Sequence, residues 1–191
     1  MKADSKRKML HRLIVLLLSL VLLLSSCGSA TYSDIEKKAV KFAESMFDSD
    51  FEYYADIISS YILAVETMKT YTSSPKVLAE FYRDYYSFDK YVVDDLGEKW
   101  KYSIEVVDTY EFTEGMNDYD YINDNWLHDS DAVVVTLNIT FSGKKWFKKV
   151  SQSERLDIYF IEENDEQVVG YYCFNNSIYM DNWIEYLQSI K

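Results

Sequence analysis

Residues 100–112 read WKYSIEVVDTYEF and decide the fold, because apolar and polar side chains alternate along them. A period of two is typical of a strand that buries one face and exposes the other. Three more strand segments follow it: residues 133–141 (VVVTLNITF) repeat the alternation, and residues 146–161 and 168–174 complete the set. Turns are expected at 142–145 and 163–166. The sequence therefore predicts a four-stranded antiparallel meander.

Apolar residues at helical spacing occupy the chain ahead of these strands. Ser33-Asp34-Ile35-Glu36 has the form of a capping box and predicts a first helix over about 34–47. Asp50 is expected to cap a second helix, whose apolar residues recur at steps of three and four from Phe51 to Met68. Both helices are amphipathic, so each has one face to pack against the sheet.

A third helix is predicted to start at Ser74-Pro75, because proline at the first helical position loses no hydrogen bond, and Gly97 is expected to stop it. Near the C-terminus, residues 177–190 predict either a short helix or an extended segment. We expect one α+β domain over residues 33–191. In it, N-terminal amphipathic helices pack on one face of a curved four-stranded antiparallel sheet.

The first 26 residues have the features of an export signal. A basic segment, residues 1–12, precedes the apolar run Leu13–Leu24. This run is shorter than the roughly 20 apolar residues that span a bilayer, so a signal peptide is the better interpretation than a membrane helix.

The residues that follow, Leu24-Ser25-Ser26-Cys27, resemble the lipobox of bacterial lipoproteins. The resemblance implies cleavage after Ser26 and lipidation of Cys27, with residues 27–32 as a tether. Two acyl chains would then hold the protein on the extracytoplasmic face of the cell membrane. The alternatives are an ordinary secretory signal and an uncleaved anchor.

The chain is strongly acidic. It has 20 Lys and Arg against 32 Asp and Glu, and without residues 1–26 it keeps 15 basic and 31 acidic residues, a formal charge of −16. Such a surface repels phosphate backbones, which argues against nucleic acid as a partner. The partners we expect are an envelope protein, a glycan or a cationic peptide.

The order of the elements, helices first and a long curved sheet second, resembles the nuclear transport factor 2-like (cystatin-like) fold over about residues 33–175. The resemblance implies a cone with a concave sheet face. It also implies that an interior Asp beside Tyr hydroxyls would be a candidate proton-transfer base, as in the ketosteroid isomerases of this fold. Two departures are the missing strand pair among the helices and the predicted C-terminal helix.

Asp108 is the residue that fits this role, because it lies in phase with the apolar face of the first strand, between Val106 and Tyr110. A carboxylate there is costly unless it is paired, hydrogen-bonded or protonated. Tyr102 and Tyr110 are the candidate hydroxyls beside it. The alternative is a bulge at Val106-Val107, which would turn Asp108 outward.

The connection at residues 114–131 is crowded with acidic and amide side chains. Oxygen ligands at this density suit Ca²⁺, and the candidate ligands are Asp118, Asp120, Asp124 and Asp129. The EF-hand register fails, however, because counting from Asp118 places Asn123 where glycine is required. A solvated acidic loop is the alternative. Zinc is excluded for this chain alone, since His128 and Cys173 are the only His and Cys after Cys27.

All 18 tyrosines lie after residue 26, and tyrosine can both stack on sugars and hydrogen-bond them. The sequence thus indicates a non-catalytic binding or accessory module at the outer face of the membrane. One alternative is a small acid–base enzyme that uses Asp108. Another is an immunity lipoprotein that binds a cationic antimicrobial peptide.

Overall fold

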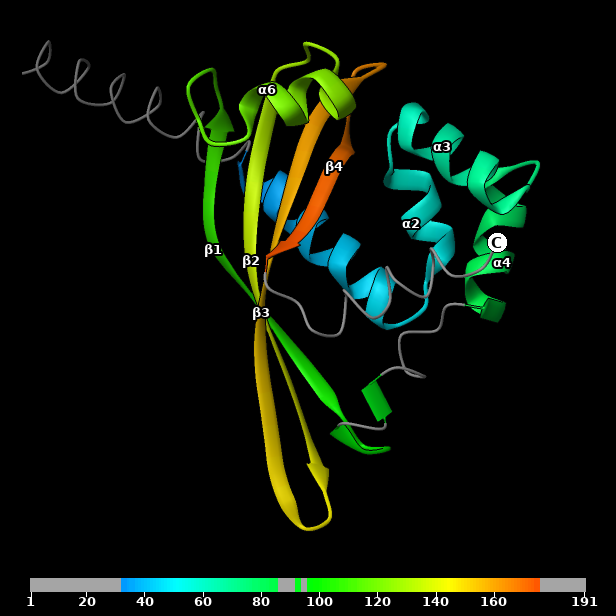
Figure 1. Cartoon of the computed structure of the whole chain (residues 1–191), viewed down its shortest axis with the longest axis vertical. Helices are drawn as coiled ribbons and strands as arrows, with labels where there is room; N and C mark the ends of the chain where they lie inside the picture. The colour runs from blue at the N-terminus through cyan, green and yellow to red at the C-terminus, as the bar shows by residue number, and fades with distance from the viewer. Residues whose placement is uncertain (1–31, 86–91, 94–95, 176–191) are drawn as a thin grey trace, which may run out of the picture. The chain divides into compact units, whose positions relative to one another are not determined.

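The computed structural model describes residues 32–85, 92–93 and 96–175 (Figure 1). The chain divides into two units, Met1–Ile35 and Glu36–Lys191, and the architecture below is that of the second. The predicted export signal, Cys27 and the predicted C-terminal helix lie outside the described residues and stay predictions. None of the described helices has the length and apolar composition needed to cross a bilayer.

Four antiparallel strands form one open sheet in the order of the sequence. They are β1 (Lys101–Phe112), β2 (Ala132–Lys145), β3 (Lys148–Glu163) and β4 (Glu166–Asn175). Helices precede the sheet along the chain, so the predicted α+β, cone-like fold class is confirmed. The turn at 163–166 is confirmed too, because Asn164 and Asp165 adopt positive φ between the paired Glu163 and Glu166.

The first and third helices begin close to the predicted residues. Residues 32–47 are helical, and α4 (Pro75–Tyr85) starts with its proline in the first turn. The hydroxyl of Ser74 accepts a hydrogen bond from the N–H of Val77 at 3.4 Å, as a capping residue does.

The single helix predicted after Asp50 is wrong, because the structure has α2 (Phe51–Ile57) and α3 (Ser60–Thr70) in its place. Ile58 is extended between them and forms a parallel bridge with Val169 of β4. Ser59 donates its N–H to the carbonyl of Val169 at 2.9 Å and then caps α3 through its hydroxyl. A tertiary backbone contact therefore overrides the continuous apolar pattern.

The acidic connection between β1 and β2 is not a fully solvated loop. It contains α6 (Tyr119–Ile122) and a π-helical turn, η1 (Asn123–Leu127). Ile122 and Leu127 are buried in a hydrophobic cluster with Phe112 and Val134 of the sheet. Apolar side chains scattered among the acidic ones thus fasten this segment to the sheet.

The sheet has two faces that are covered differently, because β1 changes sides in mid-strand. Val106 pairs with Leu137, and one extra residue, Val107, follows before Asp108 pairs with Thr136. Leu137 and Thr136 are neighbours on β2 and therefore point to opposite faces. We call the face of Leu137 the helix face and the face of Thr136 the pocket face.

The helix face carries the larger core. Phe47 packs on Phe141 with ring centroids 5.1 Å apart, and Phe42 packs on Tyr172 at 5.2 Å, so helical residues 36–47 cover this face. Tyr54 of α2 joins them, since its hydroxyl lies 3.0 Å from that of Tyr172. The strand residues buried here include Leu137, Ile139, Leu156, Ile158 and Phe160.

The turn predicted at 142–145 is wrong, because β2 continues through these residues and the chain reverses at Trp146-Phe147. Gly143 serves a different purpose. A Cβ at this position would lie 2.0 Å from the carbonyl oxygen of Leu96. Glycine is therefore needed for a close approach of two backbones rather than for a turn.

Gly143→Ala is expected to lower the free energy of unfolding by about 3 kcal/mol, because the added methyl group collides with backbone that cannot move aside. Gly115→Ala is the control, since a Cβ there meets nothing within 4 Å and only its φ of 90° is unfavourable. The control should lose about 1 kcal/mol. Urea unfolding followed by circular dichroism measures both, and equal losses would contradict the close approach.

Candidate binding pocket

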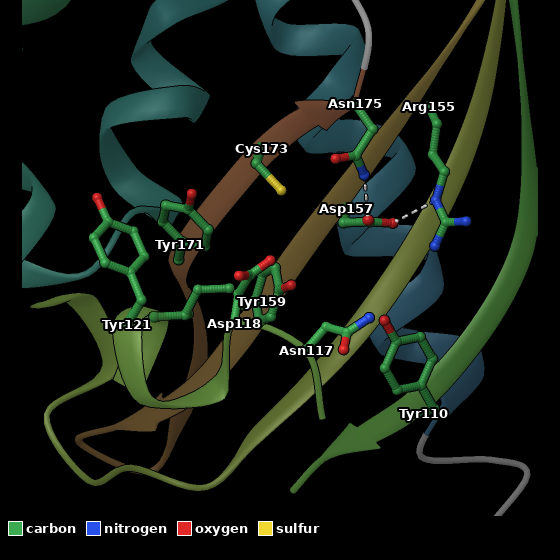
Figure 2. A pocket seen from close by; sticks show the side chains of 11 residues that line it. Tyr110, Asn117, Asp118, Tyr121, Arg155, Asp157, Tyr159, Tyr171, Cys173 and Asn175 are labelled. Carbon is green, nitrogen blue, oxygen red and sulfur yellow. Dashed lines mark hydrogen bonds and ion pairs between the residues drawn. The ribbon is translucent and has the colours of Figure 1, made fainter. Parts of the chain in front are cut away.

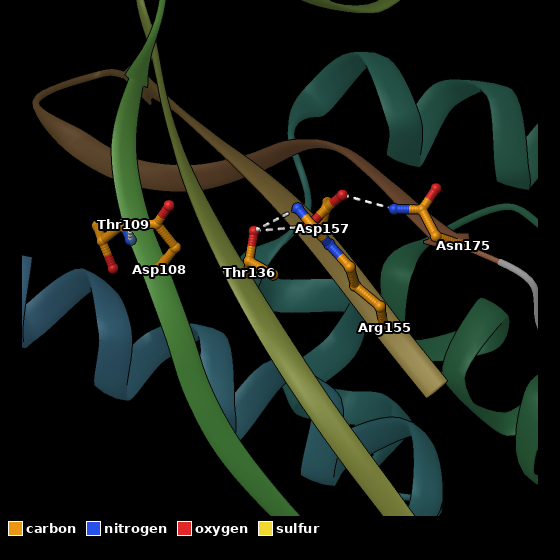
Figure 3. A network of polar contacts seen from close by, with 6 residues as sticks. All are labelled: Asp108, Thr109, Thr136, Arg155, Asp157 and Asn175. Atoms are coloured by element: carbon orange, nitrogen blue, oxygen red, sulfur yellow. Dashed lines mark hydrogen bonds and ion pairs between the residues drawn. The ribbon is translucent and has the colours of Figure 1, made fainter. Parts of the chain in front are cut away.

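A row of polar side chains crosses the pocket face (Figure 3). The strand register pairs Asp108 of β1 with Thr136 of β2, Thr136 with Asp157 of β3, and Asp157 with Cys173 of β4. Cross-strand partners share a face, so these side chains lie next to one another. The extra residue at Val107 is what brings Asp108 into this row.

Asp157 is the centre of the hydrogen-bond network in this row, and only 6% of its surface is exposed. One carboxylate oxygen accepts the hydroxyl of Thr136 at 2.6 Å and Nε of Arg155 at 3.1 Å. The other accepts the side-chain amide of Asn175 at 2.6 Å (Figure 3). A buried carboxylate needs such donors. The network therefore holds Arg155 and Asn175 in fixed positions.

A pocket of about 630 Å³ opens beside the network (Figure 2). Strands β1, β3 and β4 form part of its wall, and the residues from 117 to 122 form the rest. The lining residues are Tyr110, Asn117, Asp118, Tyr121, Ile122, Arg155, Asp157, Tyr159, Tyr171, Cys173 and Asn175. Because Ile122 and Leu127 anchor α6 and η1 on the sheet, the acidic connection is positioned as a wall of the pocket.

Tyrosines give the pocket both aromatic surface and hydroxyl groups. The rings of Tyr159 and Tyr171 lie 5.3 Å apart, and Tyr171 packs on Trp126 at 5.3 Å. Burial raises the pKa of both phenols, that of Tyr171 to about 12, so their hydroxyls stay protonated at neutral pH. Tyr121 lines the pocket with 61% of its surface exposed.

The sequence predicted that the three candidate catalytic residues lie on one face of the sheet. The structure does not bring them together. Tyr102 precedes the bulge and lies on the helix face, where its hydroxyl donates to Asp48 at 2.8 Å. Tyr110 follows the bulge and lines the pocket. Asp108 is exposed and accepts the N–H of Thr109 at 2.9 Å. The predicted common face is wrong because one extra residue reverses the alternation, and the alternative of a bulge is confirmed.

The four candidate calcium ligands have separate surroundings. Asp118 lines the pocket, and Asp129 accepts the side-chain amide of Asn123 at 2.8 Å. Asp120 and Asp124 are exposed on α6 and η1. Within the described ranges, no three His, Cys, Asp or Glu side chains form a group that could hold a metal ion. Calcium binding stays a prediction from the sequence.

The central residues of the pocket, Arg155 and Asp157, were not predicted from the sequence. One signal for them exists. They alternate with Leu156 and Ile158 at the start of the mostly apolar run 156–161, so two charged side chains share one face of the strand there. The pattern does not reveal that Asn175 lies beside them, since it is 18 positions further along the chain than Asp157.

Comparisons with known proteins assign no family to the chain. No protein-family model matches it, and neither does any curated protein. Among solved structures, the association domain of CaMKII from C. elegans aligns with it at 13% identity and a TM-score of 0.43. The alignment covers 78% of this chain and 97% of that domain.

Asp157→Ala is expected to lower the free energy of unfolding by about 3 kcal/mol, because Thr136, Arg155 and Asn175 lose their common acceptor. Asp108→Ala is the matched control. It removes an exposed carboxylate of the same row and should change stability by less than about 0.5 kcal/mol. Thermal and urea unfolding measure both, and a loss at Asp157 as small as at Asp108 would exclude a structural role for the network.

Cys173 is expected to be alkylated slowly at neutral pH, because burial raises the pKa of its thiol to about 11. An unfolded thiol has a pKa of about 8.5, so the stability that this group contributes is present below that pH. It is lost as the pH rises through 11. Iodoacetamide labelling read by peptide mass spectrometry gives the rate. A rate that levels off near pH 8.5 would contradict the raised pKa.

Proposed function

We propose that this protein is a lipid-anchored module of the bacterial envelope that binds a saccharide in the pocket beside Asp157 and catalyses no reaction. The observation that carries the proposal is the lining of the pocket, where tyrosine rings stand among hydrogen-bonding groups. Sugars have C–H faces that pack on aromatic rings, and they have hydroxyls that both donate and accept. The lining offers a partner for each of these features.

The polar groups of the pocket are suited to holding a ligand rather than to reacting with it. The carboxylate of Asp157 already accepts hydrogen bonds from three side chains. The raised pKa keeps Cys173 as a thiol, which is a poor nucleophile. A general base needs a group that can take a proton within hydrogen-bond reach of the substrate. The thiol of Cys173 does not meet this requirement.

The charge of the pocket favours neutral or basic sugars. The lining has one basic residue, Arg155, and two acidic ones, Asp118 and Asp157, so acidic groups are in excess. The rest of the domain is acidic, with a formal charge of −16 after residue 26. An acidic saccharide would be repelled on approach, whereas a neutral or amino sugar would not.

The anchoring part of the proposal rests on Leu24-Ser25-Ser26-Cys27 and the apolar run before it. Each buried CH₂ contributes about 0.8 kcal/mol, so two acyl chains on Cys27 would hold the protein on a membrane where one chain would exchange. An anchor of this kind keeps the pocket among the glycans of the envelope.

Saccharide binding is tested with the full chain in detergent and a panel of neutral and amino-sugar oligosaccharides. The chain has four tryptophans. The reporter is therefore the difference in fluorescence between wild type and Trp126→Phe, because the Trp126 ring packs on Tyr171 of the pocket. Tyr121→Ala should weaken binding roughly tenfold through the loss of a stacking ring. Tyr71→Ala is the control, since Tyr71 is 96% exposed and lies outside the pocket. A panel without any response, or equal affinities for both variants, would contradict saccharide binding.

Lipidation is tested by intact mass spectrometry of the protein extracted from bacterial membranes. The mature chain should begin at Cys27 and carry a diacylglyceryl group, and Cys27→Ala should accumulate as the uncleaved precursor. A native chain that begins elsewhere, or that carries no lipid, would show the anchoring part of the proposal to be wrong.

A further inference from the structure

The β2–β3 hairpin ends in the sequence Lys144-Lys145-Trp146-Phe147-Lys148-Lys149, which we call the hairpin tip. Trp146 is 85% exposed and Phe147 is 91% exposed. Within the described residues, β1 pairs with β2 as far as Ser142 and β4 pairs with β3 as far as Arg155, so the hairpin continues past both neighbouring strands. Figure 1 shows this two-stranded ribbon and its tip.

Folding does not explain the two aromatic residues of the tip. Trp146 and Phe147 have φ of 50° and 73° between the paired Lys145 and Lys148. A two-residue turn with positive φ at both positions favours Asn-Gly, whereas bulky side chains rarely adopt that conformation. Both rings are also exposed, so they contribute no burial to the core. Their presence at this turn indicates a contact outside the domain.

The charge of the tip is opposite to that of the rest of the domain. Four of the 15 basic residues after residue 26 lie within residues 144–149, and no acidic residue occurs from Ala132 to Ser153. The ammonium group of Lys144 lies 5.9 Å from the ring of Phe147, so cationic and apolar groups share one surface. The partner of the tip should therefore offer negative charge and an apolar layer together.

We propose that the hairpin tip contacts a bilayer surface rich in anionic lipids. Trp146 and Phe147 enter the layer between headgroups and acyl chains, where aromatic rings are favoured. The four lysines extend their ammonium groups toward the lipid phosphates, each adding attraction near the surface. This contact is independent of any lipid on Cys27.

The length of the ribbon explains how an acidic domain can make this contact. Three residues of β2 extend past its last pair with β1 at Ser142, which is about 10 Å of strand at roughly 3.3 Å per residue. Of these, Gly143 and Lys144 lie beside Leu96 and Gly97. The screening length at physiological salt is about 8 Å. Near the membrane, the tip is therefore attracted while much of the repulsion from the domain is screened.

A bilayer fits the tip better than a protein surface does. Stable protein interfaces bury about 800 Å² on each partner, which two side chains do not supply. A second copy of the tip would bring four further lysines against the first four, so two tips repel each other. Two aromatic rings beside four cations are the groups that an anionic membrane surface attracts.

The test reconstitutes the full chain into vesicles of phosphatidylcholine, with or without an equal part of phosphatidylglycerol, that contain a lipid with a doxyl quencher. The difference in quenching between wild type and Trp146→Phe reports the contact of Trp146 with lipid. We expect this difference in the anionic vesicles. Changing Lys144, Lys145, Lys148 and Lys149 to Gln should abolish it, because each lysine contributes about fivefold to partitioning.

A second variant with four lysines changed tests whether the quenching of Trp146 depends on where the positive charge lies or only on the total charge. Changing Lys69, Lys76, Lys99 and Lys101 to Gln removes the same charge from other exposed positions and should leave the quenching of Trp146 unchanged. Quenching that falls equally in both lysine variants would overturn the proposal, and so would a Trp146 that no vesicle quenches.

Replacing Trp146-Phe147 with Asn-Gly separates membrane contact from folding. Asn-Gly is the favoured turn, so the melting temperature should stay equal or rise. Trypsin cleavage at the tip should be at least fivefold slower in anionic vesicles for wild type, which is roughly the attraction of one lysine. The variant keeps the four lysines but lacks the two rings that enter the bilayer, so its protection should be smaller. A different outcome would overturn the proposal: wild type self-associates, the variant does not, and lipid does not quench Trp146 of wild type. The tip would then make a contact between copies of the chain. These measurements do not depend on lipid at Cys27, so they fail or succeed separately from the anchoring proposal.

Discussion

The extra residue at Val107 is the constraint on which the rest of the structure depends. Before it, β1 contributes Tyr102 and Val106 to the helix face, and after it the same strand contributes Tyr110 and Phe112 to the pocket face. Without the bulge, the alternation would continue and the pocket face would lose the aromatic ring on which α6 and η1 pack. One inserted residue therefore allows a single strand to serve two cores.

Asp157 is a buried carboxylate, and the donors that stabilise it also form part of the pocket wall. A carboxylate in the middle of a sheet needs donors, and three neighbouring side chains on β2, β3 and β4 supply them. Donors on three strands also tie these strands together at one level of the sheet, which fixes the register there. The same network holds Arg155 and Asn175 at the wall of the pocket, so the hydrogen bonds that stabilise the sheet also shape the pocket.

The long strand β3 separates two surfaces with different chemistry. Asp157 lines the pocket, and Lys148 of the hairpin tip begins the strand nine residues earlier. This interval corresponds to about 30 Å of extended chain. A tip that rests on lipid would hold the pocket at about this distance from the bilayer, away from the headgroups. The saccharide proposal and the membrane proposal are thus compatible within one rigid ribbon.

The sequence by itself determined the α+β class, the meander of four strands and the starts of the first and third helices, because periodicity and capping act over a few neighbouring residues. Other features were decided only by the tertiary structure and cannot be predicted from local sequence patterns. Ile58 leaves the helical pattern to bridge Val169, and Gly143 serves a backbone contact rather than a turn. Tyr102 and Asp108 are separated by a bulge, and Arg155, Asp157 and Asn175 meet through strand register. Each of these outcomes depends on which distant segment lies alongside, and that contact has a free energy larger than any local preference.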